Sequence, residues 1–252
     1  MSDQGVQRQG HGDSRGQGQN DQETKVIAFL LYPGLTAFDL VGPLQVISRL
    51  AESHPEFVPV VVGERIAPMA TDADVELVPN CAFTDVPHPY ALVVPGGTDA
   101  TLRATSDLAI RAYVRGAAES AEIVASVCSG ALILASVGLL EGRQATTHWA
   151  VQPILERYGA TYQRQRWVED GKFILSAGVS AGIDMGLQLA ARLTDEATAR
   201  QVQRSLDYDP QPPFGRPDYD DPGLYLWSRK AMATIGAPLL TARPTRLTRA
   251  GR

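Results

Sequence analysis

Four short apolar runs, separated by segments with helical spacing, dominate the sequence. They are residues 25–32 (KVIAFLLY), 57–63 (FVPVVVG), 90–97 (YALVVPGG) and 122–127 (EIVASV). A continuous apolar run rich in branched residues is typical of a strand that is buried on both faces of a sheet. Helical segments between such strands predict an α/β fold, in which a doubly wound, mostly parallel sheet carries helices on both faces.

The segments between the runs carry the end signals of helices. Thr36 and Ser106 are predicted N-caps, and Pro43 predicts that the first helix begins near it or is kinked there. Gly142 is predicted to end the helix that starts near residue 130. The remaining predicted elements are helices over residues 149–159, 180–193 and 195–206, a strand over residues 143–148 and a hairpin over residues 166–178.

Length and composition fit one domain with two tails. The chain has 252 residues, a net charge of −5 and 44% hydrophobic residues. Residues 1–24 are almost free of apolar side chains and predict a disordered N-terminal tail. Residues 25–214 form the predicted domain, and residues 215–252 a C-terminal extension with a basic end that packs on the domain or on a dimer.

The sequence also argues against several partners and locations. It has no apolar core of a signal peptide and no apolar run of about 18 residues, so we expect a soluble, cytoplasmic protein with no membrane partner. The mildly negative net charge does not provide the positively charged surface that nucleic-acid binding requires. Two cysteines, Cys81 and Cys128, make neither a disulfide framework nor a zinc pattern, and fit a reducing compartment without a bound metal.

Cys128 stands where the fourth apolar run meets the next helix. A nucleophile at a strand–turn–helix joint is held out over the end of the sheet, and the N-terminus of the helix favours its thiolate. The alternative is a buried packing cysteine, since free cysteine is among the most buried residue types. The small neighbours Ser126, Ser129, Gly130 and Ala131, which a sharp turn requires, favour the nucleophile.

Three further positions lie beyond predicted strands, at the edge where such sheets form their sites. The amide of Gly97 could pair with that of Ser129 in an oxyanion hole, or belong to an ordinary turn. Asp39, alone among apolar neighbours, is either a first-turn acid or a proton donor beside the thiol. His148 is either a partner of Cys128 or a structural histidine.

Four segments carry a wider pattern: residues 29–46 (FLLYPGLTAFDLVGPLQV), 92–97 (LVVPGG), 126–150 (SVCSGALILASVGLLEGRQATTHWA) and 176–189 (SAGVSAGIDMGLQL). In this order they resemble the ThiJ/PfpI family of the class I glutamine amidotransferase-like superfamily, and its isonitrile hydratase-like subgroup in particular. The resemblance covers about residues 25–214 and implies a flavodoxin-like sandwich, commonly a homodimer, that acts on a small molecule.

The resemblance implies a role for each candidate residue. It places the nucleophile on Cys128, the acid partner on Asp39, where many relatives have Glu, and the oxyanion or pocket amides on Gly97 and Ser129. Protease-like relatives carry His where this chain has Ser129, which argues against a protease. His148 matches an HW pair of the hydratase-like members. The implied reaction is hydration of an isonitrile to an N-substituted formamide through a thioimidate, with no metal or organic cofactor.

Other functions compete with this one. A glyoxalase-type reaction could use the same cysteine and acid, although such relatives generally have Glu and a nearby His. A ligand-sensing regulator of this kind would need a helix-turn-helix region, and too little chain follows Leu226 for one. A redox sensor is the third alternative, because an elbow thiolate oxidises readily.

Overall fold

The computed structural model describes residues 23–221 and residue 223. Its strands are β1 (Lys25–Leu30), β2 (Phe57–Gly63), β3 (Met69–Ala70), β4 (Glu76–Leu77), β5 (Cys81–Ala82), β6 (Ala91–Val94), β7 (Ile123–Val127), β8 (Gln144–Ala145), β9 (Thr161–Tyr162), β10 (Trp167–Asp170) and β11 (Phe173–Ser176). Its helices are α1 (Ala37–Ala51), α2 (Asp99–Ala104), α3 (Leu108–Ser120), α4 (Gly130–Ser136), the 3₁₀ helix η1 (Trp149–Val151), α5 (Gln152–Arg157), α6 (Ala181–Leu193) and α7 (Glu196–Ser205).

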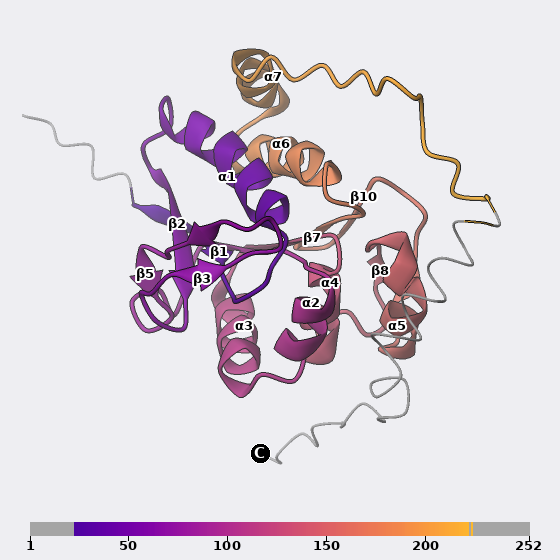
Figure 1. Ribbon diagram of the computed structural model, residues 1–252. Helices are drawn as coiled ribbons and strands as arrows, with labels where there is room; N and C mark the ends of the chain where they lie inside the picture. Colours follow the sequence, from indigo (N-terminus) through magenta and orange to yellow (C-terminus); the bar gives the residue numbers. More distant parts are fainter. Residues whose placement is uncertain (1–22, 222, 224–252) are drawn as a thin grey trace, which may run out of the picture.

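Among the described residues, seven strands form one sheet in the order β10-β11-β7-β6-β1-β2-β5. Every neighbouring pair is parallel except the β10–β11 hairpin, which is antiparallel. Helices α1, α6 and α7 contact one another on one face of the sheet, while α2, α3 and α4 lie together on the other (Figure 1). The predicted doubly wound α/β fold is therefore confirmed.

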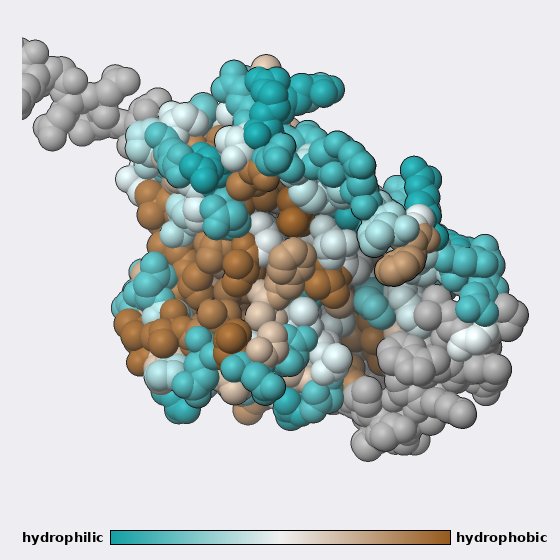
Figure 2. All heavy atoms as spheres, turned by 45° about the horizontal axis from the view of Figure 1, so that its top comes forward, coloured by the Kyte–Doolittle hydropathy of each residue, from teal (hydrophilic) through white to brown (hydrophobic). Residues whose placement is uncertain are grey.

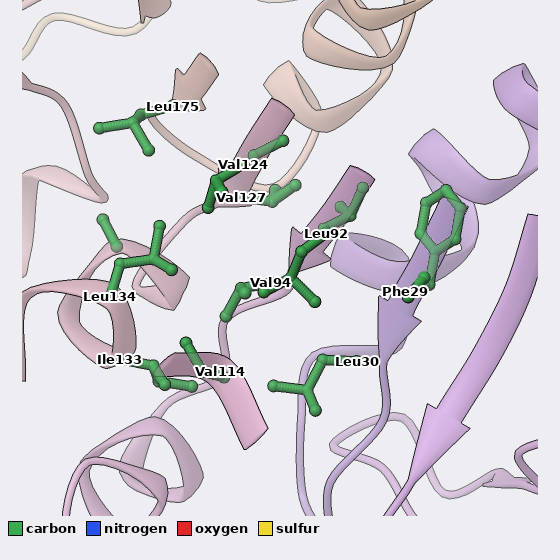
Figure 3. Close-up of a cluster of buried hydrophobic side chains, with 14 of the residues drawn as sticks. Phe29, Leu30, Leu92, Val94, Val114, Val124, Val127, Ile133, Leu134 and Leu175 are labelled. Carbon is green, nitrogen blue, oxygen red and sulfur yellow. The ribbon is translucent and has the colours of Figure 1, made fainter. Parts of the chain in front are cut away.

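The core lies on both faces of the central strands. All residues of β6 and β7 are buried, as the continuous apolar runs predict for strands covered on both sides. Figure 3 shows Val114 of α3 and Ile133 of α4 beside Val94 at the end of β6. The carboxyl ends of β1, β6 and β7 thereby come together at one edge of a tightly packed core, which is where such sheets place their sites.

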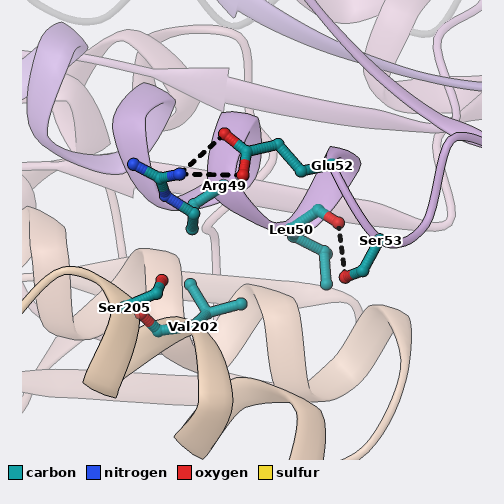
Figure 4. Close-up of polar contacts among 6 residues, drawn as sticks. All are labelled: Arg49, Leu50, Glu52, Ser53, Val202 and Ser205. Atoms are coloured by element: carbon teal, nitrogen blue, oxygen red, sulfur yellow. Dashed lines mark hydrogen bonds and ion pairs between the residues drawn. The ribbon is translucent and has the colours of Figure 1, made fainter.

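Helices α1 and α7 meet near the C-terminal end of α1. Arg49 donates two hydrogen bonds of 2.8 Å to the carboxylate of Glu52, and the Ser53 hydroxyl donates to the Leu50 carbonyl at 3.2 Å (Figure 4). Val202 of α7 is buried on the side that faces α1. These hydrogen bonds close the C-terminal end of α1, and packing against α6 and α7 holds the helix, whose first turn carries one of the candidate site residues.

Several predicted ends of elements are wrong, and each has a local cause. Helix α4 ends at Ser136 rather than at Gly142, because Gly138 adopts a φ of +84° and terminates it. Asp107, not Ser106, caps α3, since its carboxylate accepts the N–H of Ile110 at 3.0 Å. Helix α1 follows Thr36 as predicted and runs through Pro43.

The predicted strand over residues 143–148 is reduced to β8, which pairs with β9 in a separate small sheet. The predicted hairpin over residues 166–178 is present as β10 and β11. The predicted disordered tail lies outside the described residues up to residue 22, as does most of the 215–252 extension. Within the described residues, none of the helices is long and apolar enough to cross a membrane.

Candidate active site

The turn between β7 and α4 holds Cys128 in a conformation that few side chains adopt. Its φ is +58°, in the left-handed region that normally favours glycine. The N–H of Cys128 donates to the Ser176 carbonyl at 3.1 Å, and its carbonyl accepts the buried Thr147 hydroxyl at 2.9 Å. Both backbone groups are thus held by neighbouring segments, and this opposes relaxation of the turn.

Close packing around the turn explains its small residues. A Cβ on Gly130 would lie 2.1 Å from the Val94 carbonyl oxygen, a distance that no side chain can occupy. A Cβ on Gly96 would lie 2.6 Å from the Ser129 nitrogen and 2.9 Å from an Asp39 carboxylate oxygen. The backbone after β6 therefore approaches both the start of α4 and the first turn of α1, which brings the three strand ends into one site.

Asp39 is fully buried in the first turn of α1. Its Oδ2 accepts the N–H of Gly96 at 3.0 Å, whereas Oδ1 is buried without a hydrogen-bond partner among the described residues. Burial raises the pKa of Asp39 to about 7, although hydrogen bonds with Gly96 and with the Cys128 thiol oppose the shift. The carboxyl is thus positioned to exchange a proton near neutral pH.

The Cys128 thiol is coupled to this carboxyl. Burial and the neighbouring Asp39 charge raise its pKa, while hydrogen bonds from the backbone and hydroxyl of Ser129 lower it. Two neighbouring buried acids cannot both ionise at low cost, and since both pKa values are raised, the pair releases its first proton only near neutral pH. The pair that has lost this proton can hold the remaining one on either group, and the form with the proton on the carboxyl presents a thiolate.

Gly97 and Ser129 contact each other closely. The Gly97 N–H donates to the Ser129 hydroxyl oxygen at 3.0 Å, and that hydroxyl donates to the Gly97 carbonyl at 2.6 Å. The amide of Gly97 is therefore already hydrogen bonded, while the backbone of Ser129 interacts with the Cys128 sulfur. An oxyanion hole that used both amides would need the Gly97 N–H to leave the Ser129 oxygen.

His148 follows Thr147 in the chain and is the N-cap residue of η1. Within the described residues its Nδ1 accepts the N–H of Ala150 at 3.3 Å, and its ring lies 5.2 Å from that of Trp149. Burial lowers its pKa, which favours the neutral ring. The structure thus brings Cys128, Asp39, Gly97 and Ser129 into one connected group. His148 lies next to it in the chain, beside Thr147, and its Cδ2 is 3.7 Å from the position that a Cβ on Gly178 would take.

Four residues of this group carry no role in the sequence analysis. Thr147 and Ser176 hold the backbone of Cys128, and the hydroxyls of Tyr32 and Thr101 lie behind Ser129. Tyr32 directly ends a predicted strand, and Ser176 lies two residues before the end of the predicted hairpin over residues 166–178, which is a usable signal. Over the described part of the chain, no group of three or more His, Cys, Asp or Glu side chains could hold a metal ion.

Comparison with known proteins places the chain in a family. The sequence profile of the DJ-1/PfpI family matches residues 25–192. The chain is 37% identical to isonitrile hydratase from Pseudomonas putida over 209 residues, which are 82% of this chain and 90% of that protein. It is 33% identical to a deglycase from Thermococcus kodakarensis over 99 residues, 38% of this chain and 59% of that protein.

A solved structure supports the same assignment. A ThiJ/PfpI family protein from Pseudomonas syringae superposes with a TM-score of 0.77 at 34% identity, covering 90% of this chain and 98% of that chain. Sequence profile, relatives and structure therefore agree that this chain belongs to the DJ-1/PfpI family.

Proposed function

We propose that the chain hydrates isonitriles to N-substituted formamides, with Cys128 as the nucleophile and Asp39 as its acid and base. One observation carries the proposal: a fully buried carboxyl, held by the Gly96 amide at 3.0 Å, acts on the pKa of a cysteine thiol at a strained turn between a strand and a helix. The identity to the Pseudomonas putida isonitrile hydratase over 82% of this chain supports the choice of reaction.

In the proposed reaction, the Cys128 thiolate attacks the terminal carbon of R–N≡C and forms a C–S bond. The protonated Asp39 delivers its proton to the same carbon, which gives the thioimidate R–N=CH–S–Cys128. Water then attacks that carbon; the Asp39 carboxylate takes one proton from the attacking water and passes it to the imine nitrogen. As the C–S bond breaks, Asp39 takes the remaining hydroxyl proton, which releases R–NH–CHO and restores the thiolate and the protonated carboxyl. One water is consumed and no redox partner is needed.

The two carboxyl oxygens of Asp39 are suited to different tasks in the proposed reaction. Oδ2 is held by the Gly96 amide at 3.0 Å, and Oδ1 has no partner among the described residues. A carboxyl anchored through one oxygen keeps the other available for the substrate carbon and then for water. A pKa of about 7 suits this double role, because a group is most effective in both directions when its pKa is near the working pH.

The test is formation of the N-substituted formamide from an aryl isonitrile, followed by mass spectrometry. We expect activity in the parent protein, none in Cys128→Ala, and a loss of at least about 100-fold in Asp39→Asn. Cys81→Ala is the matched control, since Cys81 lies on the edge strand β5 and its loss should leave the rate unchanged. Absence of formamide from the parent, or undiminished formamide from Cys128→Ala, would refute the proposal.

A second reaction is tested alongside. The 33% identity to a deglycase supports a parallel assay with methylglyoxal, a 2-oxoaldehyde on which the same cysteine and acid could act. Higher turnover of methylglyoxal than of the isonitrile would replace the proposed reaction with glyoxalase-type chemistry. The family alone does not separate these activities, because both rest on the same pair of residues.

We further propose that the chain is a cytoplasmic homodimer. Phe38 and Val41 of α1 expose 47% and 40% of their surface. Val75 exposes 49% in the hairpin of β3 and β4, where Asp72 accepts the N–H of Ala37, in the first turn of α1, at 3.1 Å. Figure 2 shows a broad apolar area on this face, as expected of a protein interface. Light scattering should give twice the mass of the chain, and Val41→Glu should reduce it to one chain.

A further inference from the structure

Three buried hydroxyl groups form a row behind the candidate nucleophile. The Tyr32 hydroxyl lies 3.0 Å from that of Thr101, which lies 2.9 Å from that of Ser129. All three side chains are at least 95% buried. The Tyr32 hydroxyl also donates to the Pro95 carbonyl at 3.0 Å, so the row is anchored at its inner end.

The carbonyl of Gly97 has two hydroxyl donors where one would be enough. The Ser129 hydroxyl reaches it at 2.6 Å and the Thr101 hydroxyl at 2.8 Å. Ser129, in turn, has one hydroxyl proton and three groups that could accept it: the Gly97 carbonyl at 2.6 Å, the Thr101 hydroxyl oxygen at 2.9 Å and the Cys128 sulfur. The proton of Ser129 can therefore stabilise either the backbone or the thiolate, but not both at once.

We propose that Thr101 is a positioning residue, whose hydroxyl holds the Gly97 carbonyl so that the Ser129 hydroxyl can turn its proton to the Cys128 sulfur. The physical reason is the cost of an unpaired buried carbonyl, which is comparable to a lost hydrogen bond. With Thr101 in place, Gly97 keeps a donor when Ser129 turns. Without it, Ser129 is retained by the carbonyl, and the thiolate loses a hydroxyl donor.

Tyr32 has a supporting place in the row. Its hydroxyl touches Thr101 and the Pro95 carbonyl, but neither Gly97 nor Ser129 within the described residues. It fixes the Thr101 hydroxyl beside the Gly97 carbonyl without competing for that acceptor. The inference rests on the proposed function in one respect, namely that Cys128 acts as a thiolate.

The experiment measures the thiolate directly, without isonitrile. In a Cys81→Ser background, the rate at which iodoacetamide alkylates Cys128 is followed from pH 5 to 10, together with circular dichroism to verify the fold. We expect Thr101→Val to raise the apparent pKa for alkylation by about one unit and to slow alkylation about tenfold near neutral pH. Thr101→Ser, which restores the hydroxyl, should return to the parent rate.

Thr105→Val is the matched control. Thr105 is a buried threonine just after the end of the same helix, and its hydroxyl donates to the Leu102 carbonyl at 2.7 Å. Among the described residues its hydroxyl makes no hydrogen bond with the row, and its backbone N–H, which the substitution keeps, donates to the Thr101 carbonyl at 3.0 Å. We expect it to leave the alkylation profile unchanged. In Ser129→Ala, adding Thr101→Val should have no further effect, because the donor that Thr101 releases is already gone.

Two results would overturn the inference: a parent-like profile in Thr101→Val, or an effect of Thr101→Val that persists undiminished in Ser129→Ala. These failures are distinct from failure of the proposed function. If the parent makes no formamide but the alkylation rates follow the expected pattern, the proposed reaction is refuted and the role of Thr101 stands. If formamide forms and Thr101→Val alkylates at the parent rate, the role of Thr101 alone is refuted.

Discussion

Replacing Asp39 by asparagine should stabilise the protein, and the gain should depend on pH. The substitution keeps the size of the side chain, and the asparagine oxygen can still accept the Gly96 N–H. It removes a carboxyl whose pKa is raised by burial from 3.8 to about 7. This difference in pKa between the unfolded and the folded chain corresponds to about 4 kcal/mol.

The direction in which the free energy of unfolding changes with pH follows from proton binding in the folded and unfolded states. Between about pH 4 and pH 7 the folded protein keeps the proton on Asp39, whereas the unfolded chain has released it. The free energy of unfolding of the parent therefore falls as pH rises through this range and levels off above it. Asp39→Asn has no such proton, so its advantage over the parent should be near zero at pH 4 and approach about 4 kcal/mol at pH 8.

The assay is urea denaturation of the parent and the variant at half-unit steps from pH 4 to pH 8, compared as a difference so that other titrating groups cancel. Asp195→Asn is the control, because Asp195 is exposed and caps α7 by accepting the Thr198 N–H at 2.8 Å, which holds its pKa below the usual range. Its effect should be constant between pH 5 and pH 8. A difference for Asp39→Asn that does not change with pH would refute the reasoning.

Three further substitutions test the packing around the site, each by urea denaturation. Gly130→Ala should cost more than about 4 kcal/mol or prevent folding, because its Cβ would lie 2.1 Å from the Val94 carbonyl oxygen; a mild effect would contradict the close approach. Gly116→Ala in α3, where the added Cβ would meet no described atom within 4 Å beyond its chain neighbours and the backbone of its own helix, should instead stabilise the protein by about 1 kcal/mol. Asp107→Ala should cost about 1 kcal/mol because α3 loses its cap, and an unchanged stability would show that the cap is dispensable.

The features of the site that could be predicted are those that depend on the order of strands and helices along the chain. Cys128 follows an apolar strand and precedes a helix, so its place at the sheet edge is contained in the local pattern. The position of Asp39 in the first turn of α1 follows from the same kind of signal. Its complete burial does not, because burial depends on how α1 packs against α6 and on the backbone after β6, neither of which a local pattern describes.

The hydrogen bonds of the site could not be predicted for the same reason. The sequence suggests the Gly97 amide as an oxyanion donor, but only the three-dimensional arrangement shows that the Ser129 hydroxyl occupies it at 3.0 Å. Thr101 lies in α2, a helix of six residues that is too short for a clear apolar period. Gly138 and Gly142 both adopt positive φ, and spacing alone does not decide which of them ends α4.

The way in which the site holds its charge bears on what it can do. Hydrogen bonds from neutral donors oppose the effect of burial at both groups: the Gly96 amide at Asp39, and the amide and hydroxyl of Ser129 at Cys128. An arginine or lysine beside either group would fix the negative charge there, since an ion pair in a buried site is strong and directional. Dipoles from amides and hydroxyls stabilise the charge less, so it can move from sulfur to carboxyl as the proton moves the other way. Because the proposed reaction needs the charge on sulfur for the attack and on the carboxyl for the activation of water, weak stabilisation by neutral donors at both groups suits it better than one strong counter-ion.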